Sequence, residues 1–480
     1  MSLKQKALSG VFWTALQQFS TQGINFFVSI VLARLLLPSE FGLIAMIAVF
    51  MGIGAVLLNA GLGSSLIRTD NPTQEDYSTV FFFNLIGSVF MYVLMFFVAP
   101  LVADFYQEDQ LTPIIRWYSI IFIINAFAII QTTRLTKLLD FKTQMRVSIP
   151  STIFSGLIGV GLAYTGHGVW SLVIMGIAQA FASALQLWLY SNWKPSWVFS
   201  KHKFKYHFNY GYKLTLSGLI ESLFSNAYAI IIGKFFAPAQ VGFFNRADSL
   251  MKLPVGNVGT ILNKVTFPLF AEIKNDDIRL KGVYKKVMQM SVFLVAPILI
   301  TMAVLAEPLF RFLFTEKWLP AVPYFQILAV TGIMYPINAY NLNILRVKGR
   351  SDIVLKLQVI KKILFLIIIF ITFQFGIYAL LFGSVIQSFL VFFINTYYSG
   401  KFISYYIWEQ VKNLAPIILV AAFSGALVFC IDMFFKVKLN SDLLRLLIGS
   451  SFEIVCYILI TFLFKFNTLF ELFNLLKKNK

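Results

Sequence analysis

The sequence predicts an all-α integral membrane protein with about fourteen transmembrane helices. Composition, the charges of the connecting loops and an internal repeat each support this fold class. The 480 residues are 58% hydrophobic and 13% charged, whereas about a quarter of the residues in a soluble domain carry charge. Apolar runs of about 20 residues recur from end to end, and runs of this length cross a bilayer as helices.

Each apolar run defines one expected span. The basic flank "MSLKQKALSG" is typical of a signal peptide, but the apolar stretch behind it continues to Leu37 without a small-residue cleavage site. We therefore expect it to remain as the first span. The expected spans cover residues 9–36, 41–66, 79–103, 113–134, 147–165, 168–191, 210–236, 245–271, 286–312, 321–345, 353–374, 377–398, 412–434 and 442–464.

The loops alternate in charge along the chain. Clusters of Lys and Arg follow the fourth, sixth, eighth and tenth spans, whereas "ADFYQEDQL" after the third span is acidic. Cytoplasmic loops carry an excess of Lys and Arg, so these basic loops and both termini are predicted to be cytoplasmic. This topology accounts for most of the net charge of +19, and no nucleic-acid partner is needed to explain it.

An internal repeat predicts two similar halves. "LARLLLPSEFGL" from Leu32 and "IGKFFAPAQVGF" from Ile232 match at an offset of about 200 residues, and weaker matches at similar offsets occur in the same order. The first match pairs Arg34 with Lys234, Pro38 with Pro238 and Gly42 with Gly242. Chance similarity between apolar segments is the alternative.

A repeat of six spans has an even number, so both copies enter the membrane from the same side and form a parallel repeat. The expected domains are two six-helix bundles, a linker and a helix pair. They comprise an N-lobe (1–192), a cytoplasmic interfacial linker (193–209), a C-lobe (210–400) and a last helix pair with a cytoplasmic tail (401–480).

Polar side chains on membrane helices rarely face lipid, so their stripes predict an interior cavity. In the eighth span Arg246 and Lys252 outnumber Asp248, and Asn257, Asn263 and Lys264 follow them. These charges favour a water-filled cationic cavity for an anionic substrate, although polar residues also join helices in membranes. The first and seventh spans add the expected lining residues Gln18, Gln22, Asn25, Ser225 and Asn226.

Three further charged residues on the repeated spans are candidates for function. Arg34 and Lys234, each beside a proline, either form the exit rim of the cavity or are cations that reach the membrane interface. Glu221 is the candidate for a coupling or gating acid, and its structural alternative is an ion pair with a nearby lysine.

Motifs of soluble catalysts are missing from the sequence. It contains no glycine-rich phosphate loop with lysine and no zinc-spaced His and Cys set, so no cofactor, metal or enzymatic reaction is expected. The three histidines, His167, His202 and His207, all lie in predicted loops. Without a nucleotide site, transport is expected to depend on an H⁺ or Na⁺ gradient or on the gradient of the substrate itself.

Six stretches carry a family resemblance over about residues 5–400. They are "LARLLLPSEFGLIAM", "GLGSSLIRTDNPTQEDYSTVFFFNL", "APLVADFY", "GHGVWSLV", "VGFFNRADSLMKLP" and "VTFPLFAEIKNDDIRLKGVYKK". With them the chain resembles the polysaccharide-transport branch of the multidrug/oligosaccharidyl-lipid/polysaccharide exporter superfamily. Within that branch it is similar to the Wzx-like oligosaccharide flippases of the lipopolysaccharide and colanic-acid exporter type.

The resemblance implies a flippase for undecaprenyl-diphosphate-linked oligosaccharide in the cytoplasmic (inner) membrane of a bacterium. Basic residues would hold the diphosphate, and polysaccharide polymerase and chain-length proteins are the partners that it suggests. Arg246, within "FFNRA", is the position that matches the family best, and Lys252 follows by proximity. The second span departs from the family pattern because it lacks an intramembrane cation.

Two rival functions remain at this stage. A cation-coupled multidrug exporter of the same superfamily would favour acidic cavity residues for cationic drugs, whereas Arg and Lys predominate here. A membrane polysaccharide polymerase or ligase would need a large outer loop with reactive groups, and every predicted outer loop is short.

Overall fold

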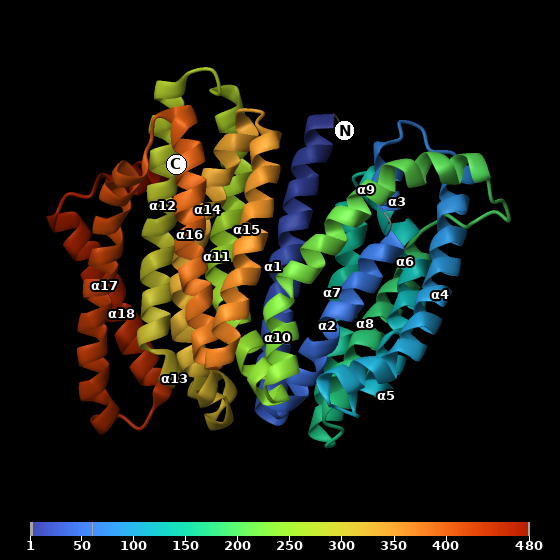
Figure 1. Ribbon diagram of the computed structural model, residues 1–480, viewed down its shortest axis with the longest axis horizontal. Helices are drawn as coiled ribbons and strands as arrows, with labels where there is room; N and C mark the ends of the chain where they lie inside the picture. Colours follow the sequence, from blue (N-terminus) through green and yellow to red (C-terminus); the bar gives the residue numbers. More distant parts are fainter. Residues whose placement is uncertain (1–2, 60, 479–480) are drawn as a thin grey trace. The chain divides into compact units, whose positions relative to one another are not determined.

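The computed structural model describes residues 3–59 and 61–478, and this part of the chain contains helices and no strand (Figure 1). Ten of the helices are long and apolar enough to cross a membrane. A further pair, α9 (Lys201–Ser225) and α10 (Ala227–Phe235), passes as one span bent by 45° and brings the number to 11. The chain is therefore an all-helical, multi-pass membrane protein.

Three long helices that the sequence predicts as spans are not among these candidates. They are α1 (Leu3–Leu35), α11 (Pro238–Glu272) and α15 (Ser351–Thr372). Their polarity explains the difference, since α1 is rich in amides, α11 contains several charges and α15 carries three lysines. The total of about fourteen spans stays a prediction. The side chains of Asn257, Asn263 and Lys264 lie outside the described residues.

The chain divides into two compact units, Met1–Gly242 (unit 1) and Phe243–Lys480 (unit 2). The seventh expected span, which the repeat assigns to the second half, forms α9 and α10 and belongs to unit 1. Its packing explains this assignment, because α9 lies against α2 (Pro38–Asn59), α3 (Leu62–Arg68) and α4 (Gln74–Tyr106). The six-span lobes inferred from the repeat stay a prediction.

Unit 1 is a bundle in which α7 packs between α1 and α8, and α6 between α4 and α8 (Figure 1). Its remaining helices are α2 (Pro38–Asn59), α3 (Leu62–Arg68), α4 (Gln74–Tyr106), α5 (Leu111–Tyr118), α6 (Ile120–Lys137), α7 (Phe141–Tyr164) and α8 (Val169–Tyr190). Local sequence signals set several boundaries. Pro38 opens α2, where the missing amide proton costs nothing, and a capping box between Thr73 and Asp76 starts α4.

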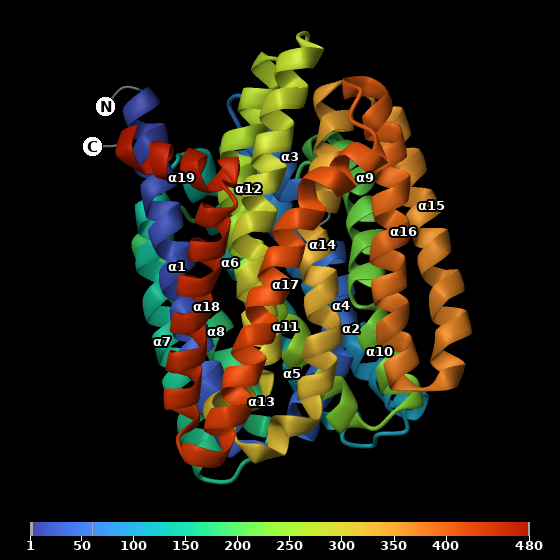
Figure 2. The same ribbon diagram turned by 90° about the vertical axis from the view of Figure 1, so that its left-hand side faces the viewer.

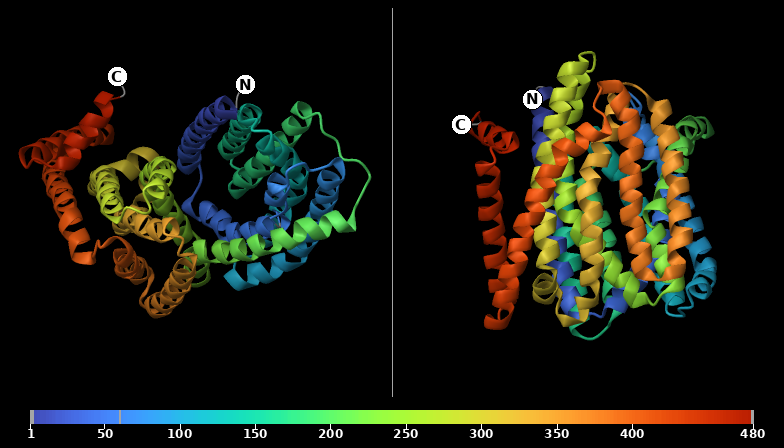
Figure 3. Two further views of the ribbon diagram at one scale, coloured as in Figure 1. Left: turned by 90° about the horizontal axis from the view of Figure 1, so that it is seen from above. Right: turned by 60° about the vertical axis from the view of Figure 1, so that its left-hand side comes forward.

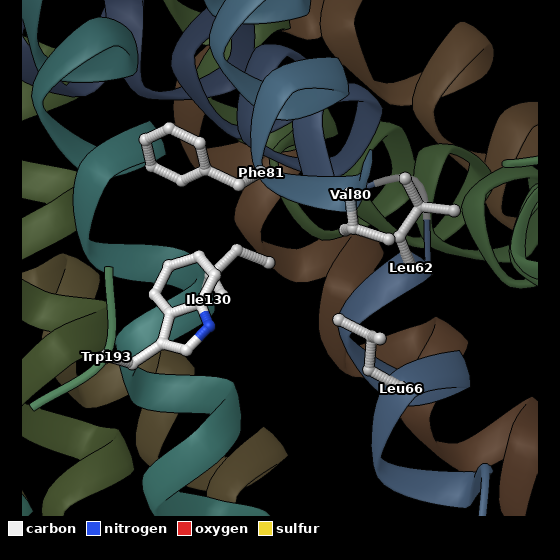
Figure 4. Packing of buried hydrophobic residues seen from close by; sticks show 6 residues of the cluster. All are labelled: Leu62, Leu66, Val80, Phe81, Ile130 and Trp193. Atoms are coloured by element: carbon white, nitrogen blue, oxygen red, sulfur yellow. The ribbon is translucent and has the colours of Figure 1, made fainter. Parts of the chain in front are cut away.

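The segment 191–200 is extended and returns from α8 to α9, as the left view of Figure 3 shows. Trp193 from this segment is buried in an apolar cluster with residues of α3, α4 and α6 (Figure 4). The other members of the cluster are Leu62, Leu66, Val80, Phe81 and Ile130. This packing fixes the connection at one end of unit 1, and α9 begins at Lys201, within the expected linker.

The prediction that all three histidines lie in loops is wrong for His202 and His207, which both lie inside α9. His202 is exposed, whereas His207 is completely buried. Ser65 of α3 is bonded to its Nδ1 at 2.8 Å, and Asp76 of α4 is bonded to its Nε2 at 3.1 Å. The aromatic and basic residues around His207 are typical of an interfacial loop. His207 is buried instead because α9 packs against α3 and α4 at this point.

Asp76 is the second buried member of this cluster, at 1% exposure. Its carboxylate also accepts bonds from the backbone amide and hydroxyl of Thr73, at 2.8 and 2.7 Å, and from Nζ of Lys203 at 3.2 Å. A buried carboxylate is tolerated when it is paired and hydrogen-bonded in this way. The cluster Ser65–Asp76–Lys203–His207 therefore ties α3, α4 and α9 together.

The first turns of α2 and α11 cross in backbone contact. A Cβ atom built on Gly42 would lie 1.8 Å from the backbone oxygen of Pro238, and one on Gly242 would lie 2.0 Å from that of Pro38. The contact is reciprocal, because each glycine meets the backbone of the proline in the other of the two matched segments. Glycine is required at both positions because a carbonyl oxygen of the opposite backbone occupies the place of a side chain.

Unit 2 is built around α14, which packs against both α12 and α16. Its helices after α11 and apart from α15 are α12 (Asp277–Val304), α13 (Ala306–Phe314), α14 (Val322–Val347), α16 (Ile377–Ile403), α17 (Ile407–Lys438), α18 (Asp442–Leu463) and α19 (Asn467–Lys478), with the 3₁₀ turns η1 (Glu316–Ala321) and η2 (Phe373–Phe375). The last long pair, α17 and α18, adds to this bundle because α17 packs along α12 (Figure 2).

Two polar clusters hold unit 2 together. Asn341 of α14 and Gln410 of α17, both fully buried, bond to each other at 3.1 Å, and Tyr284 of α12 donates to Asn341 at 2.9 Å. Between α17 and α18, Arg445 donates to both carboxylate oxygens of Asp432 at 2.9 and 2.7 Å. The amides of Asn341 and Gln410 and the guanidinium of Arg445 are thus paired, as a low-dielectric interior favours.

The Gly42–Gly242 contact predicts that alanine at either position destabilises the protein. Gly42→Ala and Gly242→Ala should each lower the free energy of unfolding by about 1–3 kcal/mol through overpacking. Gly161→Ala is the control, because a Cβ atom there meets nothing within 4 Å, and alanine favours the helix by about 1 kcal/mol. Thermal unfolding of the purified protein in detergent measures all three. Wild-type melting of both Gly42→Ala and Gly242→Ala would contradict the close contact.

The buried histidine predicts a second difference in stability. His207→Ala leaves Ser65 and Asp76 without their shared partner and should cost about 1–3 kcal/mol. His202→Ala, an exposed position on the same helix, should change stability by less than about 0.5 kcal/mol. The same unfolding assay compares them, and equal melting temperatures for the two variants would show that the cluster does not stabilise unit 1.

Candidate functional site

The two helix junctions found in the repeat place a cation just before a proline. Arg34 lies exposed in the last turn of α1, and Lys234 lies in the last turn of α10. Nζ of Lys234 donates to the backbone oxygen of Phe105 at 2.6 Å and lies 4.8 Å from the centre of the Phe105 ring. Lys234 therefore caps the carbonyl end of α4, and its role at an exit rim stays a prediction.

The seventh expected span is broken at the end of its polar stripe. α9 ends at Ser225 and α10 begins at Ala227, so Asn226 lies at the bend. The side chains of Ser225 and Asn226 both donate to the backbone oxygen of Ser222, at 3.1 and 2.9 Å. They satisfy a carbonyl next to the break, and broken helices frequently border binding sites in transporters.

Glu221 lies one turn before this break, and its side chain is exposed. A carboxylate at this depth is costly against hydrocarbon and is tolerated beside water or a cation. On α1, Gln18 and Asn25 are exposed, and Gln22 is half-buried. These residues keep the polar stripes expected from sequence, and their assignment to a cavity stays a prediction.

Arg246 of α11 is held by aromatic rings in unit 2. Its guanidinium lies 4.9 Å from the ring centre of Phe314 and 5.1 Å from that of Trp318. Trp318 in η1 is fully buried and packs at 6.0 Å from Phe314. A planar guanidinium over two rings gains cation–π attraction while it keeps its charge.

Lys252 and Asp248 form a second charged group on α11. Nζ of Lys252 lies 2.6 Å from the carboxylate of Asp248, one helical turn away. The Lys252 side chain is 64% exposed and that of Asp248 is 22% exposed. Arg246 is thus stacked on two aromatic rings and Lys252 is paired with a carboxylate, and their place in one cavity stays a prediction.

A polar cavity in unit 1 was not predicted from the sequence. It has a volume of about 450 Å³ and lies between α2, α3, α6 and α8. Its polar lining residues are Asn59, Asn125, Thr132, Thr133, Thr136 and Ser183. The sequence contains a pattern that could have indicated it. Asn125, Thr132 and Thr136 are seven and four residues apart, so they share one face of a helix.

Two apolar pockets lie elsewhere. One of about 380 Å³ borders the other side of α6 and α8 and is lined by residues such as Phe127 and Trp188. The second, of about 460 Å³, lies between α12 and α18 and contains the buried Glu453, which accepts a bond from Ser424 at 2.7 Å. Within the described residues, no three His, Cys, Asp or Glu side chains cluster as metal ligands.

Long apolar helices, a broken span and polar or cationic groups at membrane depth define a multi-pass membrane protein with the architecture of a transporter. A family model described as "Polysaccharide biosynthesis protein" matches residues 31–323. The chain belongs to this family, and the predicted resemblance to its polysaccharide-transport branch is confirmed.

Curated relatives carry names from the same field. The chain is 26% identical over 355 residues to the teichuronic acid biosynthesis protein TuaB of Bacillus subtilis (strain 168), and the matched region covers 73% of each chain. It is 24% identical over 372 residues to the lipopolysaccharide biosynthesis protein WzxC of Escherichia coli (strain K12), which covers 76% of this chain and 75% of the relative.

Solved structures share the fold of this chain. The lipid II flippase MurJ in its inward closed conformation superposes with a TM-score of 0.76 at 12% identity, over 95% of this chain and 98% of the other. An inward-facing multidrug resistance MATE family transporter of the MOP superfamily gives 0.59 at 14% identity, over 80% and 96%. Because both sequence identities are this low, the similarity to these structures is evidence for a shared fold.

Proposed function

We propose that this chain is a flippase for undecaprenyl-diphosphate-linked oligosaccharide repeat units. It moves them from the cytoplasmic to the periplasmic leaflet of a bacterial inner membrane, where they supply surface polysaccharide or lipopolysaccharide synthesis. The chain binds and releases this substrate without changing it chemically, so it is not an enzyme. Both termini lie in the cytoplasm, and polymerase and chain-length proteins are its candidate partners.

The family match over residues 31–323 carries this proposal. It is supported by the names of the relatives, which belong to teichuronic acid and lipopolysaccharide biosynthesis. The fold shared with a lipid II flippase agrees with it. Among these observations the family match gives the strongest support, because the same fold also occurs in a multidrug transporter.

Electrostatics supports an anionic substrate. A lipid-linked diphosphate carries negative charge, and Arg246 presents a guanidinium, the side chain best shaped to bind phosphate oxygens. The rings of Phe314 and Trp318 orient this group, and Lys252 adds an exposed ammonium on the same helix. A cationic drug would be repelled by these groups, which disfavours multidrug export.

In this mechanism, two six-span lobes, residues 1–192 and 210–400, alternate about the cationic cavity and expose it to each side in turn. Gln18, Gln22, Asn25, Ser225 and Asn226 form polar walls. Arg34 and Lys234 belong to the exit rim. Glu221 responds to an H⁺ or Na⁺ gradient and gates the cycle.

The charge requirement is tested by Arg246→Ala combined with Lys252→Ala. Loss of two charged contacts to phosphate should reduce export by about 100-fold or more, while the amount of protein in the membrane stays constant. The measurement is mass spectrometry of lipid-linked oligosaccharide in a deletion strain, with the wild type or the variant restored. The deletion strain and the variant should accumulate diphosphate-linked repeat units and lose surface glycan. Unchanged lipid-linked pools in the deletion strain would refute the proposed substrate.

The role of Glu221 is tested by Glu221→Gln, which keeps the shape of the side chain and removes its titratable charge. The initial rate of transport in proteoliposomes should lose its response to an imposed proton or sodium gradient. Glu40→Gln, a carboxylate that bonds the backbone amide of Leu37 at 2.6 Å, is the control and should keep the response. Equal responses of wild type and Glu221→Gln would make Glu221 a structural residue.

A further inference from the structure

The cavity between α2, α3, α6 and α8 (the unit 1 cavity) has an uncharged, polar lining. Among the described residues that line it, six are amides or hydroxyls, seven are apolar, and none is charged. A diphosphate needs cationic partners and a cationic drug needs anionic ones, so neither is matched here. Its volume of about 450 Å³ falls within the range typical of small-molecule sites.

Three of the polar groups lie on one face of α6. Asn125, Thr132 and Thr136 follow each other by seven and four residues, so they project from the same face of the helix. From Asn125 to Thr136 the helix rises by 11 residue steps, or about 16 Å. Ser183 of α8 and Asn59 of α2 add polar groups from two other helices. A ligand in this cavity therefore meets hydrogen-bonding groups along its length.

Hydrogen bonds within α6 determine what the threonines offer. The hydroxyl of Thr132 donates to the backbone oxygen of Ala128 at 3.1 Å, that of Thr133 to Ile129 at 2.8 Å, and that of Thr136 to Thr132 at 2.9 Å. Their protons are thus used inside the helix, and the oxygens of Thr132 and Thr133 present acceptor sites. The oxygen of Thr136 already accepts one bond from Nε2 of Gln144 at 3.0 Å and has one further acceptor site. Beside them, the amides of Asn59 and Asn125 supply donors as well as acceptors.

This pattern matches the hydroxyl groups of a sugar. Each sugar hydroxyl donates one hydrogen bond and accepts others, so a row of acceptors with nearby amides can satisfy several of them. Apolar residues, with Phe122, Leu58 and Leu187 among them, line the rest of the cavity and provide surfaces for the C–H faces of the rings. The described residues that line the apolar pocket on the other side of α6 and α8 include no amide or hydroxyl side chain. The polar lining is therefore on the side of these helices that faces the unit 1 cavity.

We propose that the unit 1 cavity is a binding subsite for the neutral saccharide part of the transported lipid. This inference rests on the proposed function and deepens it, because it separates recognition of the sugar from recognition of the diphosphate. Residues of α2, α6 and α8 bind the saccharide, and the uncharged lining leaves the phosphates to other residues. Selectivity for one repeat unit over another then depends on Asn59, Asn125, Thr132, Thr136 and Ser183.

The test measures binding of two lipids to purified full-length protein in detergent by native mass spectrometry. One lipid is the diphosphate-linked repeat unit isolated from the deletion strain, and the other is undecaprenyl phosphate, which has no sugar. In Thr132→Val/Thr136→Val, two acceptors are lost while the shape is kept. Its Kd for the glycosylated lipid should rise by about 10-fold, and its Kd for undecaprenyl phosphate should stay constant.

A matched control separates binding from folding. Thr152 and Thr372 make the same bond to a backbone oxygen four residues earlier, at 2.9 and 2.7 Å, outside the cavity. Thr152→Val/Thr372→Val should bind both lipids as the wild type does. Ala55→Leu, which narrows the cavity and keeps every hydroxyl, should also weaken binding of the glycosylated lipid alone.

The outcomes distinguish this inference from the proposed function. If the wild type binds the glycosylated lipid and the Thr132→Val/Thr136→Val and Ala55→Leu variants bind it equally well, the cavity holds water and the subsite is refuted. An equal loss for both lipids would assign the threonines a structural role and would also refute it. If the wild type binds the glycosylated lipid no better than undecaprenyl phosphate, the proposed function itself fails.

Discussion

Hydrocarbon offers no hydrogen-bond partner to a backbone amide or carbonyl, and the rest of this structure depends on that constraint. It requires helices wherever the chain crosses the bilayer, and it requires that polar groups at helix ends find partners within the protein. Lys234 bonded to the carbonyl of Phe105 and the side chains of Ser225 and Asn226 bonded to Ser222 both follow from this requirement. The same constraint makes every remaining polar side chain at membrane depth informative about function.

The sequence predicted the helices well because apolar runs and proline breaks are local signals. The breaks before Pro38 and Pro238 occur where the repeat indicated them. His207 was assigned wrongly, since its burial depends on Ser65 and Asp76, which are distant in sequence. The division of the chain at Gly242 likewise reflects packing of α9 against earlier helices, which no pattern within α9 specifies.

For the candidate site, the charged residues could be identified from the sequence. The contacts that surround each of them could be seen only in the three-dimensional structure. In the sequence, Arg246 and Lys252 are two similar cations on one helix. In the structure, Arg246 is stacked on aromatic rings, whereas Lys252 is paired with Asp248. The polar cavity of unit 1 is made by four helices, and each contributes a few residues that are common in membrane helices. A stripe on α6 was visible in the sequence, but a cavity is a property of several helices together.

The reciprocal contact of Pro38 with Gly242 and of Pro238 with Gly42 has the form of an interface between identical subunits, in which residue i meets residue j and j meets i. A chain of one repeat could make this contact only as a homodimer, and there a single glycine would serve both sides. Fusion of two copies turns that one position into two separate codons. Each codon can then mutate independently, and an enlarged side chain at either one disrupts the same crossing.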